Sequence, residues 1–148
     1  MFRSFFLCLF VVSMLTACGD PEDTRPGKPV KTRQEAFKAV LRAYEPMTKM
    51  VKEGDIDPDK FAALAATFMT KRDGPWSHFG PDTNYPPTKA KPAVWAKAAE
   101  FDQAKAEFLA ATDAMSVVAQ AKDQGKIEAA YGRVFKSCKS CHDSFREN

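Results

Sequence analysis

The most reactive side chains of this sequence lie in one pentapeptide near its C-terminus, Cys138-Lys139-Ser140-Cys141-His142. Two cysteines three positions apart, followed directly by a histidine, can attach a c-type haem, form part of a zinc site or act as a redox dithiol. In haem attachment each thiol adds to one vinyl group of the porphyrin, and the adjacent imidazole coordinates the iron. The rest of the sequence indicates which of these three chemistries applies.

The dithiol and zinc alternatives fit the sequence less well than haem attachment. A thioredoxin-like dithiol places its first cysteine at a helix N-terminus within a βαβ unit, whereas this pair lies near the end of a predicted helix. A zinc site needs four ligands, and the fourth would have to be His78, the only other histidine. Three of the zinc ligands would then crowd a single helical turn. We therefore favour a haem held by Cys138 and Cys141, with His142 as axial iron ligand.

The first 17 residues are predicted to be a cleaved signal peptide. Arg3 precedes an apolar run over residues 5–15, which is too short to span a bilayer as a helix. The run ends in the letters LTAC, which resemble the lipobox of bacterial lipoproteins, so Cys18 is expected to become the acylated N-terminus. The alternative is an ordinary secretory signal in which Cys18 has no role. The lipobox predicts a periplasmic protein anchored by lipid to a bacterial membrane, and haem attachment of this kind also takes place outside the cytoplasm.

Composition excludes several classes of function. Arg3 is the only charged residue of the leader, so the net charge of +3 falls to +2 once the leader is removed. The remaining acidic and basic residues are interspersed, with no basic stripe, which argues against nucleic acid as a partner. Beyond Cys18 the pentapeptide holds the only two cysteines, which excludes a disulfide-stapled scaffold. No second constellation of acid, base or nucleophile is present, so we expect that the protein is not an enzyme.

Hydrophobic periodicity predicts an all-α protein, an antiparallel four-helix bundle over residues 31–148. A flexible tether over residues 18–30, rich in proline and glycine, is expected to precede it. Helices are predicted over 31–53, 58–70, 93–123 and from 124 almost to the C-terminus. In three of them apolar residues recur at alternating spacings of three and four, which is typical of a bundle seam. The proline-rich segment over 71–92 is too long for a turn and should pack across the bundle.

The reactive pentapeptide continues the apolar stripe of the last predicted helix. At about 100° per residue, Cys138, Cys141 and His142 fall within an arc of roughly 100°. All three side chains can therefore meet one flat molecule in the bundle interior. The elements thus predict a haem bound in the core near the C-terminal helix.

A CxxCH motif at the end of a four-helix chain resembles the cytochrome c′ family. The stretch YGRVFKSCKSCHDSFREN resembles the last helix of that family, FGPDT…TKAKPAVW its connection into the third helix, and TRQEAF its opening helix. Together these stretches span nearly the whole chain after the tether. The resemblance implies a four-helix bundle that carries one covalently attached haem c.

The resemblance also implies a pentacoordinate, high-spin haem with His142 as its only protein ligand. The distal position of the family falls on Phe37, through the RQEAF match, and a phenyl ring cannot ligate iron. The next methionine, Met47, would lie about 15 Å further along a helix and is expected in the core. Such an open but guarded iron admits small diatomic gases, which for this family are nitric oxide and carbon monoxide.

Further residues match positions that the family places around the haem: Arg33, Gln34, Thr88 and Lys89. Arg33 lies one turn before Phe37, and its guanidinium can pair with a haem propionate; the alternative is a solvated arginine at the helix start. The family often has a carboxylate at the position of Lys89, so this lysine departs from the pattern. Arg146 lies one turn after His142 and is implied in the proximal pocket; the alternative is a cation that complements the helix C-terminus.

We therefore expect a cytochrome that binds nitric oxide and sequesters or senses it. The chief alternative is an electron-transfer cytochrome with a redox partner protein, in which gas binding is incidental. Phe37 argues against that alternative, because an iron with one face free of a ligand has a higher reorganisation energy on reduction. A zinc-stabilised structural lipoprotein is the third hypothesis. The family is often dimeric through its first helices, so a homodimer is a further expectation.

Overall fold

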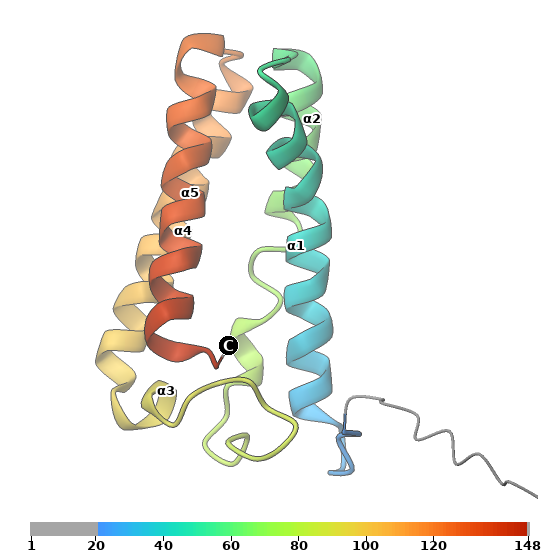
Figure 1. The fold of residues 1–148 in the computed structure, drawn as a ribbon, viewed down its shortest axis with the longest axis vertical. Helices are drawn as coiled ribbons and strands as arrows, with labels where there is room; N and C mark the ends of the chain where they lie inside the picture. The colour runs from blue at the N-terminus through green and yellow to red at the C-terminus, as the bar shows by residue number, and fades with distance from the viewer. Residues whose placement is uncertain (1–20, 148) are drawn as a thin grey trace, which may run out of the picture.

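The computed structural model describes residues 21–147, which form an antiparallel four-helix bundle (Figure 1). Its helices are α1 (Pro29–Glu53), α2 (Pro58–Met69), the 3₁₀-helix η1 (Trp76–His78), α3 (Ala93–Ala96), α4 (Ala98–Gln120) and α5 (Gln124–Phe145). Within the described residues the only β-pairing is an isolated bridge between Ala90 and Arg146. The prediction of an all-α bundle is confirmed. The predicted signal peptide and Cys18 lie outside the described residues.

Local sequence signals explain where α1 ends and where α2 begins. Gly54 ends α1 with a φ of 70°, a left-handed conformation that glycine adopts without steric cost. Asp57 then caps α2: its carboxylate accepts hydrogen bonds from the amides of Asp59 (2.9 Å) and Lys60 (3.1 Å). Pro46 lies on the exposed side of α1 and does not end the helix. None of the helices between residues 21 and 147 combines the length and apolarity that crossing a membrane requires.

The predicted third helix is two helices. Lys97, with φ −124° and ψ 49°, breaks it between the single turn α3 and the long helix α4. The turn buries Val94, and the indole N–H of Trp95 donates to the carbonyl of Gly80 at 2.8 Å. Tertiary packing of α3 against the preceding segment therefore bends the chain, although the apolar pattern of the sequence continues through the bend.

The segment before α1 is attached to the bundle from Asp23 onward, so that part of the predicted tether over residues 18–30 belongs to the fold. Asp23 is only 1% exposed, and its carboxylate accepts hydrogen bonds from the amides of Val30 (2.9 Å) and Lys31 (3.1 Å) and from the Tyr85 hydroxyl (2.8 Å). The Arg25 guanidinium stacks over the Tyr85 ring at 3.8 Å. Because Asp23 satisfies otherwise unpaired amides at the start of α1, it fixes the chain there.

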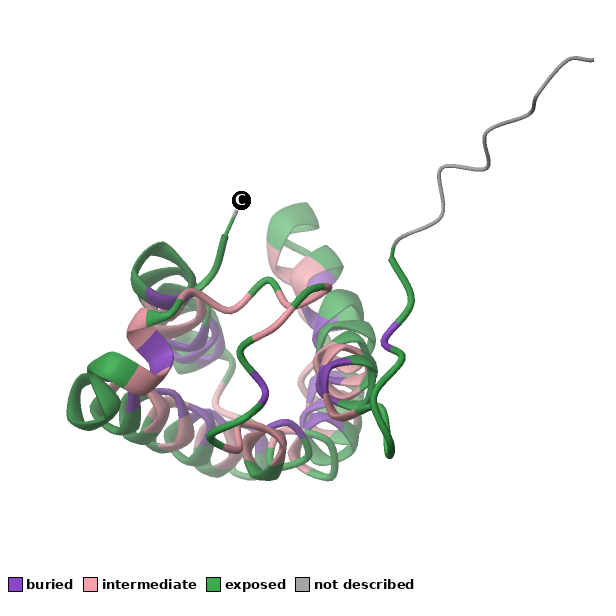
Figure 2. Ribbon diagram, turned by 90° about the horizontal axis from the view of Figure 1, so that it is seen from below, coloured by how far each residue is buried: buried purple, intermediate pink, exposed green. Residues whose placement is uncertain are grey.

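Two apolar clusters form the core, and buried residues face the bundle interior while exposed ones face outward (Figure 2). The larger cluster fills the end where α1 meets α2 and α4 meets α5, and it includes Met47, as predicted. The smaller cluster contains Val94, Phe101 and Phe145 and lies at the opposite end, beside α3. The last turns of α5, with the CxxCH motif, therefore run from the larger cluster to the smaller one.

Candidate functional site

The two cysteines of the motif are unpaired, half-buried thiols on the inward stripe of α5. Cys138 packs against the larger core cluster and Cys141 against the smaller one. Burial, with a further contribution from Cys141, raises the pKa of the Cys138 thiol to about 11, and burial also raises the pKa of Cys141. Burial therefore keeps both sulfurs mainly protonated at neutral pH, which disfavours the reactive thiolate of a redox dithiol. The pair suits addition to two vinyl groups of one molecule.

His142 follows on the same helix but is exposed. Partial loss of solvent lowers the pKa of its imidazole, and the positive charge of Arg146 lowers it further, while Asp143 acts in the opposite direction. The imidazole is therefore neutral at physiological pH and has a lone pair available for a metal. Arg146 also donates its backbone N–H to the His142 carbonyl at 3.0 Å, and its own extended conformation ends the helix there.

The zinc alternative lacks its set of ligands. Between residues 21 and 147, no three side chains of the types His, Cys, Asp and Glu lie close enough together to hold a metal ion. His78, the proposed fourth ligand, lies in η1, where its carbonyl accepts a hydrogen bond from Arg33 (2.7 Å). The donor set therefore fits haem attachment and does not fit a tetrahedral zinc site.

Phe37, the predicted distal residue, belongs to a chain of aromatic rings. Its half-buried ring meets Trp76 edge-on at 5.6 Å between ring centroids and Phe79 at 6.1 Å. Phe79 in turn contacts Phe101 at 4.8 Å, and Phe101 contacts Phe145 at 5.4 Å. The contacts thus lead from α1 through Phe79, directly after η1, and through α4 to the last turn of α5. The sequence also marks Trp76 and Phe79 as core or haem-pocket residues, but only the structure shows that they pack against Phe37.

Arg33 is buried, so the alternative of a solvated arginine at the helix start is wrong. Only 4% of the residue is exposed, and burial lowers the pKa of its guanidinium. One terminal nitrogen donates to the carbonyl of His78 (2.7 Å) and the hydroxyl of Thr83 (2.9 Å); the other donates to the Thr83 carbonyl (3.2 Å) and the Thr88 hydroxyl (2.7 Å). Within the described residues Nε is its only nitrogen without a hydrogen bond. Arg33 is thus mainly a clamp on the following loop, and only Nε is left for a propionate.

The other predicted peripheral residues meet at the same loop. Gln34 donates its side-chain amide to the Pro87 carbonyl at 3.0 Å. Thr88 also accepts the amide of Ala90 (3.0 Å), while the Lys89 side chain is exposed. The structure therefore brings Arg33, Gln34 and Thr88 together, and it leaves the role of the Lys89 side chain a prediction.

The loop is also tied to the end of α5. The Lys89 carbonyl accepts the amide of Glu147 (2.8 Å), and the Lys91 amide donates to the Phe145 carbonyl (2.9 Å). The Lys91 ammonium donates to the Asp143 carbonyl (2.9 Å). The proline-rich segment thus packs across one end of the bundle, as predicted, and connects α1 with the turn that carries His142. Arg146 lies in this connection through its backbone, and its side chain is exposed.

Comparison with known proteins identifies the family of this fold and motif. The family model described as cytochrome C′ matches residues 28–146. The chain belongs to the cytochrome c′ family. Cytochrome c′ from Alcaligenes xylosoxydans xylosoxydans is 35% identical over 124 residues, which cover 83% of this chain and 96% of that protein. Cytochrome c′ from Rubrivivax gelatinosus is 34% identical over 125 residues, with 83% and 97% covered.

Solved structures of cytochrome c′ share the fold. The crystal structure from Rubrivivax gelatinosus superposes with a TM-score of 0.77 at 34% identity and covers 84% of this chain and 98% of that one. The nitric oxide complex of a Leu→Ala variant of cytochrome c′ from Alcaligenes xylosoxidans gives the same TM-score, identity and coverage. Cytochromes c′ are electron-transfer or gas-binding haem proteins, not classical enzymes, and carry covalently bound haem c. This cytochrome c′ therefore carries haem c, and the two unpaired cysteine sulfurs and the neutral imidazole of α5 fit that group.

Proposed function

We propose that this cytochrome c′ holds a pentacoordinate haem that binds nitric oxide and sequesters it. Phe37 carries the proposal: the residue that the family resemblance puts on the distal side is a phenyl ring, which offers no donor atom to the iron. Trp76 and Phe79 pack against its edge and keep the ring in place. Haem iron with one open coordination position can bind a diatomic gas.

Three residues of α5 would hold the haem. Cys138 and Cys141 would hold it as thioethers: each S–H would add across one vinyl double bond, with the sulfur bonding to one carbon and the hydrogen to the other, so no external reductant would be consumed. His142 would supply the imidazole that ligates the iron, and Phe37 would guard the site. Because its pKa is lowered, the imidazole keeps its lone pair over the physiological pH range.

The solved relatives support nitric oxide as the ligand. They include nitric oxide complexes of Leu→Ala, Leu→Ile and Leu→Val variants of cytochrome c′ from Alcaligenes xylosoxidans. Those complexes belong to a protein that is 34% identical to this chain and shares its fold. The same class of ligand is therefore the best candidate here.

Optical and electron paramagnetic resonance spectra of the holoprotein test the proposal. We expect high-spin, five-coordinate ferric and ferrous spectra and a new absorbance spectrum on addition of nitric oxide. A low-spin spectrum with a sulfur or nitrogen sixth ligand would contradict the open site and favour the electron-transfer alternative. Failure to bind nitric oxide at a high-spin iron would contradict gas binding alone.

We also propose that the protein is periplasmic and anchored by acylation of Cys18. Asp23 is fixed to the bundle, so only the five residue steps from Cys18 to Asp23 can act as a linker. An extended chain covers at most about 3.6 Å per residue, so this linker reaches about 18 Å. The end of the bundle where α1 begins would therefore lie close to the membrane surface.

Mass spectrometry of the N-terminal peptide and membrane fractionation test the anchor. We expect an acylated Cys18 in the wild type and release of a Cys18→Ser variant from membranes. Retention of that variant on membranes would contradict a lipid anchor at this residue.

A further inference from the structure

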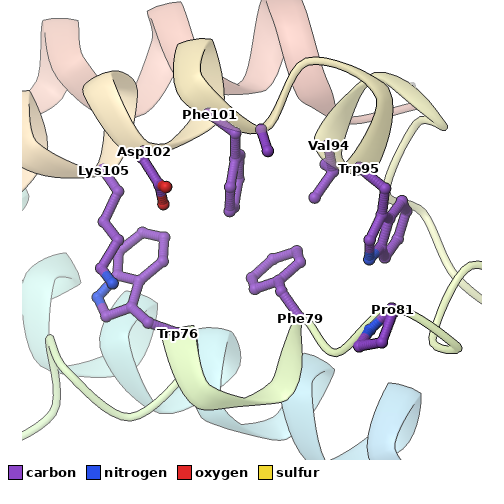
Figure 3. A pocket seen from close by; sticks show the side chains of 9 residues that line it. Trp76, Phe79, Pro81, Val94, Trp95, Phe101, Asp102 and Lys105 are labelled. Carbon is purple, nitrogen blue, oxygen red and sulfur yellow. The ribbon is translucent and has the colours of Figure 1, made fainter.

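A cavity of about 300 Å³ lies between the start of α4 and the segment that follows η1 (Figure 3). Four aromatic rings line it, those of Trp76, Phe79, Trp95 and Phe101. None of the three residues proposed to hold the haem contributes to its wall. The lining of the cavity therefore contains no haem attachment residue. Trp76 and Phe79, which line it, also contact Phe37.

The inner part of the cavity is apolar. Val94 and Phe101, on its inner wall, are 3% and 8% exposed, whereas Ala98 on its rim is exposed to solvent. The indole N–H of Trp95 already donates to the Gly80 carbonyl at 2.8 Å, so it needs no hydrogen-bond acceptor from a ligand. A molecule that enters would meet mainly carbon surfaces there.

The opposite end of the cavity is polar. Asp102 and Lys105 lie there in Figure 3, with the indole nitrogen of Trp76 beside Lys105. The Lys105 ammonium lies 5.8 Å from the centre of the Trp76 ring. Among the described residues the buried Trp76 Nε1 has no hydrogen-bond acceptor, an unsatisfied donor that native proteins rarely leave. A hydroxyl group at this end would meet the carboxylate of Asp102 and the ammonium of Lys105.

We propose that this cavity binds a neutral, single-ring aromatic molecule of the phenol class. An apolar cavity of about 150 Å³ is enough to hold benzene, so the space here accommodates one ring and a substituent. Aromatic walls favour a planar ring, because offset and edge-to-face contacts add to the area buried. The polar end gives a ring with one hydroxyl group a fixed orientation. A diatomic gas would fill only a small part of the volume.

Binding in the cavity is coupled to Phe37, an extension that rests on the proposed gas-binding function. Trp76 and Phe79 line the cavity and also contact the Phe37 ring, at 5.6 and 6.1 Å between centroids. A ring in the cavity fills the space into which these two side chains could retreat. Phe37 then has less freedom to move aside for a gas, so an occupied cavity slows gas entry.

Titration of the holoprotein with phenol tests the site. The sequence holds two tryptophans, and both line the cavity, so both indole N–H signals in the NMR spectrum of the diamagnetic ferrous carbon monoxide form report on it. We expect both signals to shift with phenol, and cyclohexanol to bind at least tenfold more weakly because it lacks the aromatic ring. Equilibrium dialysis of the ferric holoprotein gives the same comparison without any gas. Absence of saturable phenol binding would overturn the site, and equal affinity for cyclohexanol would overturn its aromatic preference.

A matched pair of variants localises the binding. Ala98→Phe fills the rim of the cavity, whereas Ala110→Phe adds the same ring at an exposed position on another face of α4. We expect at least a tenfold loss of phenol affinity in the first variant and none in the second. An equal effect of the two substitutions would refute the location.

The carbon monoxide association rate tests the coupling. With saturating phenol we expect association to slow at least twofold in the wild type and in Ala110→Phe, and to stay unchanged in Ala98→Phe. An unchanged rate in a wild type that binds phenol would overturn the coupling. A holoprotein that binds phenol but neither carbon monoxide nor nitric oxide would refute the proposed function and leave the cavity assignment standing.

Discussion

At the scale of single residues, Phe37 has the clearest consequence for function. Its ring is half-buried and is held at its edges by Trp76 and Phe79, which belong to a different part of the chain. A phenyl ring is bulky and cannot coordinate iron. Phe37 would therefore act as a steric barrier to gas entry, and its effect would be on rate.

Replacing Phe37 with Ala should speed carbon monoxide association at least tenfold, because the ring that obstructs entry is removed. Stopped-flow or flash-photolysis measurements on the ferrous holoprotein check this rate. Phe135→Ala removes the same ring at a position that is 55% exposed on α5, and it should leave the rate unchanged. An unchanged rate in Phe37→Ala would show that the ring does not guard the iron.

Asp23 should make stability depend on acid pH. Burial alone would raise the pKa of its carboxyl, but hydrogen bonds from Lys31, Tyr85, Arg25 and Val30 prevail and lower it. A carboxyl with a lowered folded-state pKa stabilises the fold above its unfolded value of about 3.9, and this contribution is lost as the pH falls through the folded value. The stability advantage of the wild type over Asp23→Asn should therefore shrink on acidification.

Thermal unfolding followed by circular dichroism between pH 7 and pH 2 measures this difference. Asp82→Asn changes an exposed carboxyl of the neighbouring loop and serves as the control, with little effect at any pH. A difference in unfolding temperature between the wild type and Asp23→Asn that stays constant over the whole pH range would rule out the carboxylate as the source of that difference.

At the scale of elements, the loop between η1 and α3 connects two helices that are distant in sequence. Arg33 of α1 holds it through three hydrogen bonds and holds His78 of η1 through a fourth, and the end of α5 holds it through backbone bonds at Lys89 and Lys91. The guanidinium suits this task because its planar donors reach several acceptors at once. The loop therefore sets the position of α1, with Phe37, relative to the turn of α5 that carries His142.

Arg33→Lys should destabilise the holoprotein by about 2 kcal/mol or more, because a single ammonium cannot replace both terminal guanidinium nitrogens. Urea unfolding measures the loss. Arg42→Lys makes the same change at an exposed position of α1, where an effect within about 0.5 kcal/mol is expected. Equal effects of the two substitutions would show that the buried hydrogen bonds contribute little.

At the scale of the whole molecule, haem would join the two halves of the core. Cys138 packs against the larger cluster and Cys141 against the smaller one, so two thioether bonds would fix one rigid group to both. A group that binds the folded chain stabilises it relative to the unfolded chain, and a covalent bond makes its effective concentration high.

A Cys138→Ser/Cys141→Ser double variant should lack covalent haem and unfold at a lower temperature than the wild type. Mass spectrometry checks the attachment, and circular dichroism follows the unfolding. The Cys141→Ser single variant keeps one thioether and should retain haem with an intermediate midpoint. A haem-free double variant as stable as the holoprotein would contradict the joining role.

The sequence by itself determined the features that follow from neighbouring residues. Gly54 and Asp57 mark the end of one helix and the cap of the next, and both act through their own backbone or side chain. The alternating apolar spacing placed Cys138 and Cys141 on the inward face of α5, where the structure has them. Such signals are readable without a fold, because a helix brings residues three and four positions apart onto one face.

Only the tertiary structure decided how distant segments meet. Arg33 finds its acceptors 45 to 55 residues away, and the carboxylate of Asp23 meets the hydroxyl of Tyr85 62 residues away. The break at Lys97 likewise follows from the packing of α3 on the preceding segment, while the local apolar pattern runs on unbroken. Hydrogen bonds and ring contacts of this kind depend on the path of the whole chain, and no local periodicity encodes that path.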